Sequence, residues 1–269
     1  MDHNPQAEQM AHESMLRCLT AQADAIWPQE RPLVERYALP RAAAVVDVGC
    51  GSGEISERLL DLLSGSRLTG VDIHAPHLER ARARCARFGD RARFVTGDAF
   101  ALELPDAAFD LAVCRHLTQA IPAPARAVAE LARVTKPGGV LHVLAEDYGM
   151  MHFAPTRRDC DEFFRIGPGE YARAGGTDLR SGRRMGAALR AAGCRDVRVD
   201  WVIVDTQRVA RETFAAIWES WRDGYTNAIA TASGLAPADV RDYWEDMIAA
   251  IRNPDGYAVW FVPVWSGRR

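Results

Sequence analysis

The sequence predicts an α/β protein built on a doubly wound, Rossmann-like sheet of seven mostly parallel strands with helices on both faces. Two observations carry this prediction. Between residues 41 and 147, short apolar runs alternate with helical stretches of about ten residues, a rhythm typical of βαβ units. The first apolar run, residues 42–48, leads directly into a glycine-rich turn, which is where such sheets bind nucleotides.

Each element of this core has its own signal. Apolar runs bounded by glycine, proline or polar residues predict strands over residues 42–48, 67–73, 92–95, 109–114 and 140–145. Apolar residues at helical spacing predict helices over residues 54–63, 76–88 and 123–134. The run Lys136-Pro137-Gly138-Gly139 predicts a tight turn before the fifth strand, because proline ends a helix and glycine permits the turn.

The segments on either side of the core have a looser pattern. Before it, helices are predicted over residues 8–19 and 29–38, separated at Trp27-Pro28 because proline interrupts a helix. After it, the pattern predicts a loop with one short helix over 148–177, a helix over 182–192, a strand over 197–204, helices over 211–232 and 237–251, and a last strand over 257–265. No linker separates these segments, so we expect one compact unit.

Composition narrows the class of partner. The 269 residues include 33 basic and 36 acidic side chains, and this balance argues against a nucleic-acid partner. Arginines at 80, 84, 87 and 91 recur at helical spacing and are expected to form a solvated face. The longest apolar stretch, Tyr257–Gly267, is about half the ~20 residues that a membrane span needs. Six dispersed cysteines without a CxxC pair predict a cytoplasmic protein with no zinc site, and no metal is expected.

The glycine-rich turn is the most informative motif. It reads Asp47-Val48-Gly49-Cys50-Gly51-Ser52-Gly53, and its glycines allow a tight turn and a close approach of backbone to ligand. A dinucleotide fingerprint needs a third glycine at position 54, where Glu54 stands, so a dehydrogenase fits less well. A polyphosphate ligand needs a basic residue at the loop, and none follows until Arg58.

This motif resembles the first motif of class I S-adenosylmethionine-dependent methyltransferases. Three further features match that family in order. Asp72 ends the second strand, 19 residues after Gly53, and Gly97-Asp98-Ala99 follows the third strand. The turn over residues 136–139 precedes the fifth strand. The resemblance covers residues 40–147 and implies a small-molecule methyltransferase.

The resemblance implies S-adenosylmethionine as the cofactor, with S-adenosylhomocysteine as the product. Asp72 is expected to accept the ribose hydroxyls, and Asp98, with Ala99 beside it, to bind the adenine. The glycine turn is expected along the sulfonium and amino-acid end, where Asp47 suits a cationic amino group. The full set of expected cofactor-binding residues is Asp47, Gly49, Cys50, Gly51, Gly53, Asp72, Ile73, Asp98, Ala99 and Arg115.

The acceptor is expected at the carboxyl ends of the fourth and fifth strands. His116 follows the fourth strand, and Glu146, Asp147 and Tyr148 follow the fifth, so these four are the catalytic candidates. The alternatives are a helix cap for the first segment and a salt bridge to an arginine for the carboxylates. Two carboxylates and nearby aromatic residues favour a nitrogen nucleophile, with oxygen or sulfur as alternatives. A non-catalytic binding protein on the same fold is the alternative from another class.

The acceptor itself is expected to be a small polar or amino-acid-like metabolite. Trp218, Trp221 and Tyr225 recur on one helix and serve either a cationic ligand or the core. Arginines at 165, 180, 183 and 184 are candidates for holding a carboxylate. No membrane partner is expected, and the apolar strand over 257–265 is a candidate edge for a homodimer.

The predicted organisation has three parts. Residues 1–40 form an N-terminal helical lid, with His12, Trp27 and Tyr37 as candidates to face the site. Residues 41–150 form the S-adenosylmethionine-binding core. Residues 151–269 complete the sheet and add a helical insertion over the acceptor.

Overall fold

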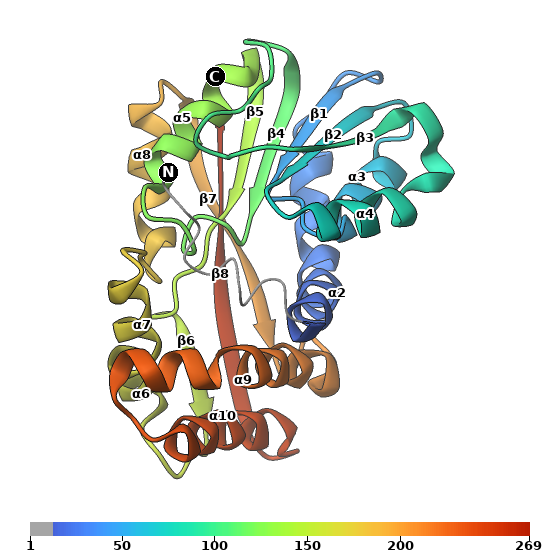
Figure 1. The fold of residues 1–269 in the computed structure, drawn as a ribbon. Coiled ribbons are helices and arrows are strands. Elements are labelled where there is room, and N and C mark those ends of the chain that lie inside the picture. Colours follow the sequence, from blue (N-terminus) through green and yellow to red (C-terminus); the bar gives the residue numbers. More distant parts are fainter. Residues whose placement is uncertain (1–12) are drawn as a thin grey trace.

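The computed structural model describes residues 13–269 and shows one eight-stranded sheet in the order β3-β2-β1-β4-β5-β8-β6, with β7 on the other edge of β8 (Figure 1). The strands are β1 (Ala44–Val48), β2 (Arg67–Asp72), β3 (Ala92–Thr96), β4 (Phe109–Arg115), β5 (Thr135–Leu144), β6 (Met151–Ala154), β7 (Arg195–Asp205) and β8 (Tyr257–Arg268). β1 to β5 pair in parallel, and β8 runs antiparallel to its neighbours.

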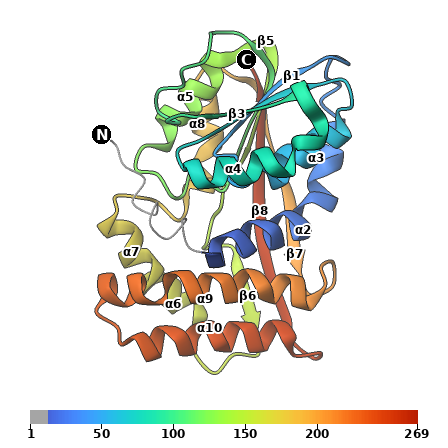
Figure 2. The same ribbon diagram turned by 45° about the vertical axis from the view of Figure 1, so that its right-hand side comes forward.

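Helices cover both faces of this sheet and one end of it (Figure 2). They are α2 (Glu13–Glu35), α3 (Glu54–Leu62), α4 (Ala75–Arg84), α5 (Pro124–Val134), α6 (Cys160–Ile166), α7 (Pro168–Ala174), α8 (Met185–Ala191), α9 (Arg211–Ser233) and α10 (Pro237–Arg252), with short 3₁₀ turns over Ala86–Arg91 and Ser181–Arg184. The predicted doubly wound α/β class is confirmed. The sheet has one strand more than predicted, because β6 is too short to leave a pattern within the predicted loop.

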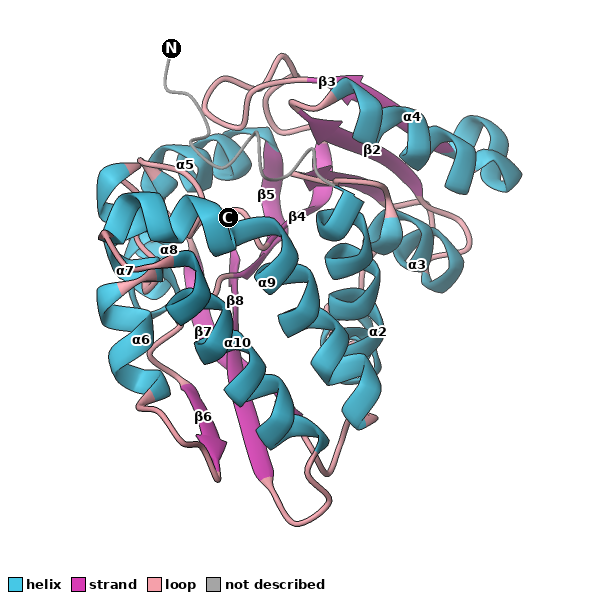
Figure 3. Cartoon of the chain, turned by 60° about the horizontal axis from the view of Figure 1, so that its bottom comes forward, coloured by secondary structure: helices cyan, strands magenta, loops and turns pink. Residues whose placement is uncertain are grey.

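Three large apolar clusters hold the layers together, and a small fourth one contains Phe100, Ile121 and Ala127. One lies between β1 and the helices α2, α3 and α4, and includes Val45 and Leu59. Another lies on the opposite face, against α5 and α8, and includes Leu131. The third joins the far half of β8 to α2, α6, α9 and α10, and its centre holds the fully buried Trp218 and Trp260. Figure 3 shows α2, α9 and α10 as neighbouring helices over this third cluster.

The N-terminal segment departs from the prediction. The break expected at Trp27-Pro28 is wrong: α2 is one helix that contains both Pro28 and Pro32. Both prolines lie on its exposed side, so the carbonyl groups that lose a backbone donor can bind water instead. The opposite side of the helix is fixed by contacts such as the Gln29 side chain, which binds the backbone of Ile203 in β7. The start of the predicted helix, at residues 8–12, lies outside the described residues.

The last described strand along the chain, β8, lies inside the sheet and not at its edge. β8 pairs with β5 and then β6 along one side, and with β7 along the other. The expectation that residues 257–265 form a free edge for a homodimer is therefore wrong. The same pairing opens a gap between β5 and β6, where residues 145–150 leave the sheet and return, tied to β8 through Ala145 and Met150.

Smaller elements also differ from their predictions. The motif over residues 136–139 is paired within β5, at a bulge in the register with β4 where Gly138 has a φ of 81°. The arginine face is largely paired, since Arg84 and Arg87 bind acidic residues of α3. Residues 148–177 hold two short helices, not one. None of the helices within residues 13–269 is long and apolar enough to cross a membrane.

Candidate active site

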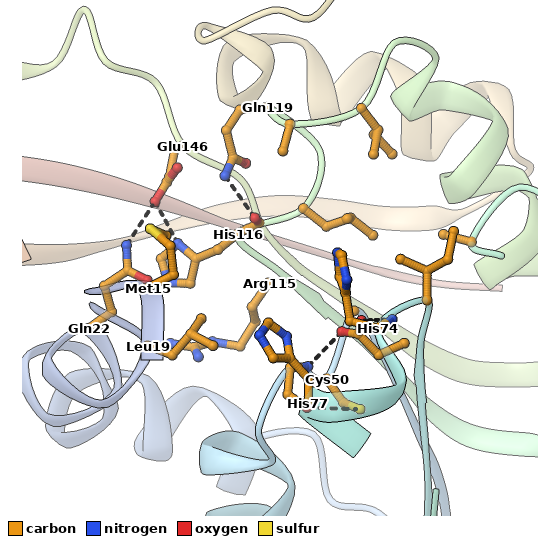
Figure 4. A pocket seen from close by; sticks show the side chains of 18 of the residues that line it. Met15, Leu19, Gln22, Cys50, His74, His77, Arg115, His116, Gln119 and Glu146 are labelled. Atoms are coloured by element: carbon orange, nitrogen blue, oxygen red, sulfur yellow. Dashed lines mark hydrogen bonds and ion pairs between the residues drawn. The ribbon is translucent and has the colours of Figure 1, made fainter. Parts of the chain in front are cut away.

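A cavity opens at the carboxyl ends of β1, β2, β4 and β5, where Figure 4 shows labelled side chains of α2 and of the strand ends. Residues of α6, α7, α9 and α10 complete its lining. Of the expected cofactor-binding residues, it is lined by Asp47, Gly49, Cys50, Gly51, Asp72, Ile73, Asp98, Ala99 and Arg115. Of the catalytic candidates, it is lined by His116, Glu146 and Tyr148. One cavity therefore brings together residues that are up to about a hundred positions apart in sequence.

The glycine turn has the backbone that its composition predicts. Gly49, Gly51 and Gly53 all have positive φ, a conformation that residues with a side chain rarely adopt. The backbone amides of Gly49 and Cys50 both donate to the carbonyl of Val71, which ties the turn to β2. Gly53 itself does not line the cavity, and a Cβ there would lie 3.0 Å from Ala81. Its role is close packing of α3 on α4.

Asp72 and Asp98 each organise the loop that follows their strand. Asp72 accepts hydrogen bonds from the backbone of Gly51 at 2.8 Å and of His74 at 2.9 Å. Asp98 accepts one from the backbone of Phe100 at 2.8 Å. Both are the helix-cap or loop contacts that any strand-end aspartate makes, but both side chains also line the cavity. Oxygen lone pairs thus remain for hydroxyl or amino groups of a ligand.

Asp47 is buried at the floor of the cavity. Its carboxylate accepts a hydrogen bond from the Ser56 hydroxyl at 2.7 Å. Burial raises its pKa from 3.8 to about 6, although Ser56 and the charge of Arg115 act in the opposite direction. A buried carboxylate that is this hard to ionise is stabilised when a cation arrives beside it.

Arg115 belongs to a buried network that sequence reasoning missed. Its Nε donates to Glu30 of α2 at 2.8 Å, and the same carboxylate oxygen accepts from His142 Nε2 at 2.8 Å. Tyr37 bonds the other nitrogen of His142. Burial alone raises the pKa of Glu30, but Arg115 and His142 outweigh it and lower the pKa to about 2. No sequence signal connects Glu30 and Arg115, which are 85 residues apart.

One nitrogen of the Arg115 guanidinium lacks a hydrogen-bond partner among the described residues. The Arg115 side chain is 7% exposed, it lines the cavity, and its Nη2 has no hydrogen-bond partner within the described part of the chain. An unpaired, buried guanidinium nitrogen is costly unless a ligand supplies an acceptor. A carboxylate is the acceptor whose geometry and charge match this group best.

His116 and Glu146 form the second polar centre. His116 Nδ1 lies 2.6 Å from Glu146 Oε1, and Figure 4 shows both side chains at the cavity. Since a carboxylate only accepts, Nδ1 carries a proton, and whenever the ring holds no second proton, Nε2 has its lone pair free. His116 Nε2 is buried without a partner among residues 13–269. Gln22 at 3.5 Å and the Tyr148 hydroxyl also donate to Glu146. The pKa of Tyr148 is raised well above 10 by burial and by Glu146, so Tyr148 stays protonated.

Asp147, the remaining catalytic candidate, does not line the cavity. Its carboxylate is fully buried and accepts two hydrogen bonds from Arg183, at 2.5 and 2.8 Å. The salt-bridge alternative of the sequence analysis therefore applies to Asp147 but not to Glu146.

The N-terminal helix reaches the cavity through residues other than those expected. Met15, Leu19 and Gln22 line it, whereas Trp27 does not and Tyr37 bonds His142 instead. His12 lies outside the described residues. The spacing of these three residues places them on one side of α2, but the same spacing is equally typical of a core-facing stripe.

Comparison with known proteins agrees with the geometry. The family model described as "Methyltransferase domain" matches residues 46–143. A probable methyltransferase, ltbC, of Aspergillus luteorubrus is 34% identical over 140 residues, which cover 48% of this chain and 47% of that protein. The demethylmenaquinone methyltransferase of Thermus thermophilus is 31% identical over 133 residues, covering 49% and 60%. The chain thus spans about half the length of these curated relatives.

Solved structures share the fold over most of the chain. The [4+2]-cyclase SpnF has a TM-score of 0.56 at 23% identity, covering 90% of this chain and 80% of that one. Phosphoethanolamine N-methyltransferase 2 of Haemonchus contortus, in complex with S-adenosyl-L-methionine, has a TM-score of 0.56 at 18% identity, covering 90% and 52%. These likenesses concern the fold.

Fold, site and family model agree on one class: residues 46–143 match the methyltransferase-domain family, and their motifs resemble the S-adenosylmethionine-dependent class I type. S-adenosylmethionine is the cofactor of this class, and the cavity fits it. The unpaired nitrogen of Arg115 suits its carboxylate, and buried Asp47 suits its amino group. Ile73, an apolar side chain that is 46% exposed at the cavity, suits the adenine ring.

Proposed function

We propose that this protein transfers a methyl group from S-adenosylmethionine to a nucleophilic atom of a small-molecule acceptor. The observation that carries the proposal is His116, whose Nδ1 is held by Glu146 and whose Nε2 has no partner in residues 13–269. A sulfonium-bound methyl group is already activated, so the protein has to align the acceptor, exclude water and accept one proton. His116 is the group we propose for the proton.

We propose the following roles at the cofactor end. Asp72 accepts the ribose hydroxyls, and Asp98 with Ala99 binds the adenine. Arg115 binds the carboxylate, and Asp47 faces the amino group. The glycine turn leaves room for the amino-acid end to pass close to the backbone. These assignments follow from lining the same cavity and from the donors and acceptors that each side chain still has free.

The choice of acceptor atom depends on how many carboxylates line the cavity. The nitrogen preference of the sequence analysis depends on two adjacent carboxylates, and Asp147 is bound to Arg183 outside the cavity. An amine reacts as its neutral free base, whereas a hydroxyl group becomes a good nucleophile only when a base takes its proton. We therefore propose oxygen as the acceptor atom and keep nitrogen as the alternative. In the transfer, the acceptor oxygen bonds the methyl carbon, the carbon–sulfur bond breaks, and the proton passes to His116 Nε2.

We also propose that α2 acts as part of a cover over the cavity. Met15 and Leu19 contribute apolar surface to it, and Gln22 reaches Glu146. Water excluded in this way cannot compete with the acceptor.

The proposal is tested with S-adenosylmethionine whose methyl group is deuterated. Purified protein is added to a cell extract, and mass spectrometry locates the label and the atom that carries it. Label in one small molecule, on oxygen, is the expected result, and label on nitrogen would select the alternative. Label in nucleic acid or protein contradicts the small-molecule proposal. Bound S-adenosylhomocysteine without any labelled product would favour a non-catalytic binding protein.

Replacing Asp72 by asparagine is expected to weaken S-adenosylhomocysteine binding. The amide keeps one acceptor for the neighbouring backbone but loses charged hydrogen bonds to the ribose, worth about 1.5–3 kcal/mol, or about 10–100-fold in Kd. Isothermal titration calorimetry measures this effect. Asp106→Asn is the matched control, since the Asp106 side chain is 73% exposed and lies outside the cavity. Equal affinities for both variants would remove Asp72 from the cofactor site.

Asp47 predicts a pH dependence of cofactor binding. Without ligand the folded protein holds this proton up to about pH 6, whereas an ordinary aspartate releases it near 3.8. This group therefore lowers the stability of the ligand-free protein as the pH rises from 3.8 to about 6. A bound amino group favours the ionised carboxylate, so the affinity for S-adenosylhomocysteine is expected to rise between about pH 5 and 7. Calorimetry across this range measures the slope, and Asp47→Asn is expected to flatten it.

A further inference from the structure

The part of the cavity beyond His116 has walls of a distinct kind. Six aromatic side chains from the loop after β5 and from α6, α7, α9 and α10 line it: Tyr148, Phe164, Tyr171, Trp221, Tyr225 and Trp244. Their rings are in contact, for example Tyr148 with Trp221 at 5.3 Å and with Phe164 at 5.9 Å. Packed rings of this kind hold a flat wall, which suits a ring-shaped, apolar ligand.

Arg115 is the one arginine or lysine among the described residues that line the cavity, and it is proposed to bind the carboxylate of the cofactor. The arginines that the sequence offered for an acidic acceptor lie outside the cavity lining. Arg165 pairs with Glu162, Arg184 pairs with Asp178, and Arg183 binds buried Asp147. The fourth, Arg180, is exposed. A negatively charged acceptor would lose its hydration here without gaining a counter-charge, which is strongly unfavourable.

A positively charged acceptor is disfavoured for a different reason. Glu146 is the carboxylate nearest to the aromatic wall, and its two oxygens already accept hydrogen bonds from His116, Gln22 and Tyr148. The cofactor brings its own positive sulfonium to the same cavity, so a second cation would need a carboxylate with free capacity. Aromatic rings attract cations, which favours a positively charged acceptor. The affinity of a cationic phenol relative to a neutral one measures which effect is larger.

Three polar atoms at the wall have no partner within residues 13–269. They are His116 Nε2 and Gln119 Oε1, which accept, and Trp244 Nε1, which donates. Gln119 is oriented by its own amide, which donates to the carbonyl of His116 at 2.8 Å and leaves the oxygen free. Buried polar atoms are nearly always paired in folded proteins, so His116 Nε2 and Gln119 Oε1 mark positions where a ligand supplies hydrogen bonds. The indole nitrogens of Trp218 and Trp260 are unpaired as well and do not line the cavity, so the Trp244 nitrogen by itself marks no such position.

We infer that the methyl acceptor is a neutral, mainly apolar ring compound that carries a hydroxyl group and at least one further polar atom. The hydroxyl lies at His116, and the further polar atom lies within reach of Gln119. This inference rests on the proposed function and replaces the polar, amino-acid-like acceptor expected from the sequence. Two observations support it: the uncharged aromatic wall and the unpaired polar atoms that lie along it.

Three phenols of similar size test the charge preference. They are para-ethylphenol, which is neutral, para-hydroxyphenylacetate, which is an anion, and tyramine, which is a cation. Binding to the complex of the protein with S-adenosylhomocysteine is measured by ligand-observed NMR, so no turnover is needed. The neutral phenol is expected to bind about tenfold or more tightly than either charged one.

Leu179→Arg is the matched variant, because Leu179 lines the cavity and is only partly buried. The added cation is expected to improve hydroxyphenylacetate binding by about tenfold and to leave ethylphenol nearly unchanged. Its melting temperature reports whether it folds, and if it does not, the three phenols on the unmodified protein decide alone. Equal affinities, tightest binding of tyramine, or no binding of any phenol at about 1 mM would overturn the inference.

The two proposals fail in different ways. A preference for the neutral phenol, together with no labelled product in any extract, keeps the inference about the cavity and contradicts methyl transfer. Labelled products that are all charged keep methyl transfer and overturn the neutral acceptor.

Discussion

Replacing His116 by asparagine is expected to lower the rate of methyl transfer by about 10²–10⁴-fold, the contribution typical of a general base. Asparagine suits this position because His116 has a φ of 52°, and asparagine tolerates that left-handed conformation better than most residues. Its amide can still donate to Glu146. The variant therefore loses the ring nitrogen that accepts the proton while its backbone stays unstrained. The rate is measured with deuterated S-adenosylmethionine on the acceptor found in extract.

Two further measurements separate a chemical role of His116 from a structural one. S-adenosylhomocysteine binding is expected to stay within about twofold of the unmodified protein, because His116 is not assigned to the cofactor. His152→Asn makes the same exchange at an exposed position outside the cavity and is expected to keep full activity. Glu146 positions His116, so Glu146→Gln is expected to lower kcat with little change in KM. An H116N variant as active as H152N would remove the general base from the proposal.

Glu30→Gln is expected to cost about 3–5 kcal/mol of folding stability, the range found when one partner of a buried ion pair is removed. The Glu30 side chain is 1% exposed and holds both Arg115 and His142. Its neutral amide removes the carboxylate that is hydrogen-bonded to the buried Arg115 charge. Urea unfolding measures the change. Glu35→Gln on the same helix is the control, since its pair with Arg31 is exposed and is expected to contribute less than about 1 kcal/mol.

The same variant is also expected to change how folding stability depends on pH in the acid range. Because the pKa of Glu30 is lowered from 4.5 to about 2, its contribution is fully present above pH 4.5 and is lost as the pH falls toward 2. E30Q is expected to lack that part of the acid-induced loss. Cofactor binding gives a second readout: S-adenosylhomocysteine should bind more weakly to E30Q, while methylthioadenosine, which lacks the carboxylate, should bind unchanged. A cost equal to that of E35Q would show that the network adds nothing.

The sequence carried the core of this fold because its signals are local. A buried strand that ends in Asp47 and three glycines, and a second that ends in Asp72, define their positions within a few residues of the chain. Nine of the ten expected cofactor-binding residues line one cavity, and Gly53 is the exception. The position of these residues at strand ends was enough, since parallel strands bring their carboxyl ends to one edge.

The parts that sequence reasoning missed depend on partners far along the chain. Glu146 and Asp147 are neighbours with the same chemistry, and only Arg183, 36 residues from Asp147, separates their roles. Pro28 predicts a break that the packing of α2 on β7 and α9 prevents. The role of Glu30 is set by Arg115 and His142, neither of which leaves a mark near residue 30. Such contacts are properties of the folded arrangement.

The central position of β8 has a consequence for the order of folding. β6 and β7 have no described sheet partner other than β8, and β8 is synthesised after both. Until residues 257–268 leave the ribosome, these two strands have unpaired backbone groups, while β1 to β5 already have one another. The nucleotide-binding half can therefore assemble early, and the acceptor half must wait for a pairing of high contact order. During that interval Trp218 of α9 lacks Trp260 of β8, the ring it packs against in the folded protein, so apolar surface of the third cluster stays uncovered.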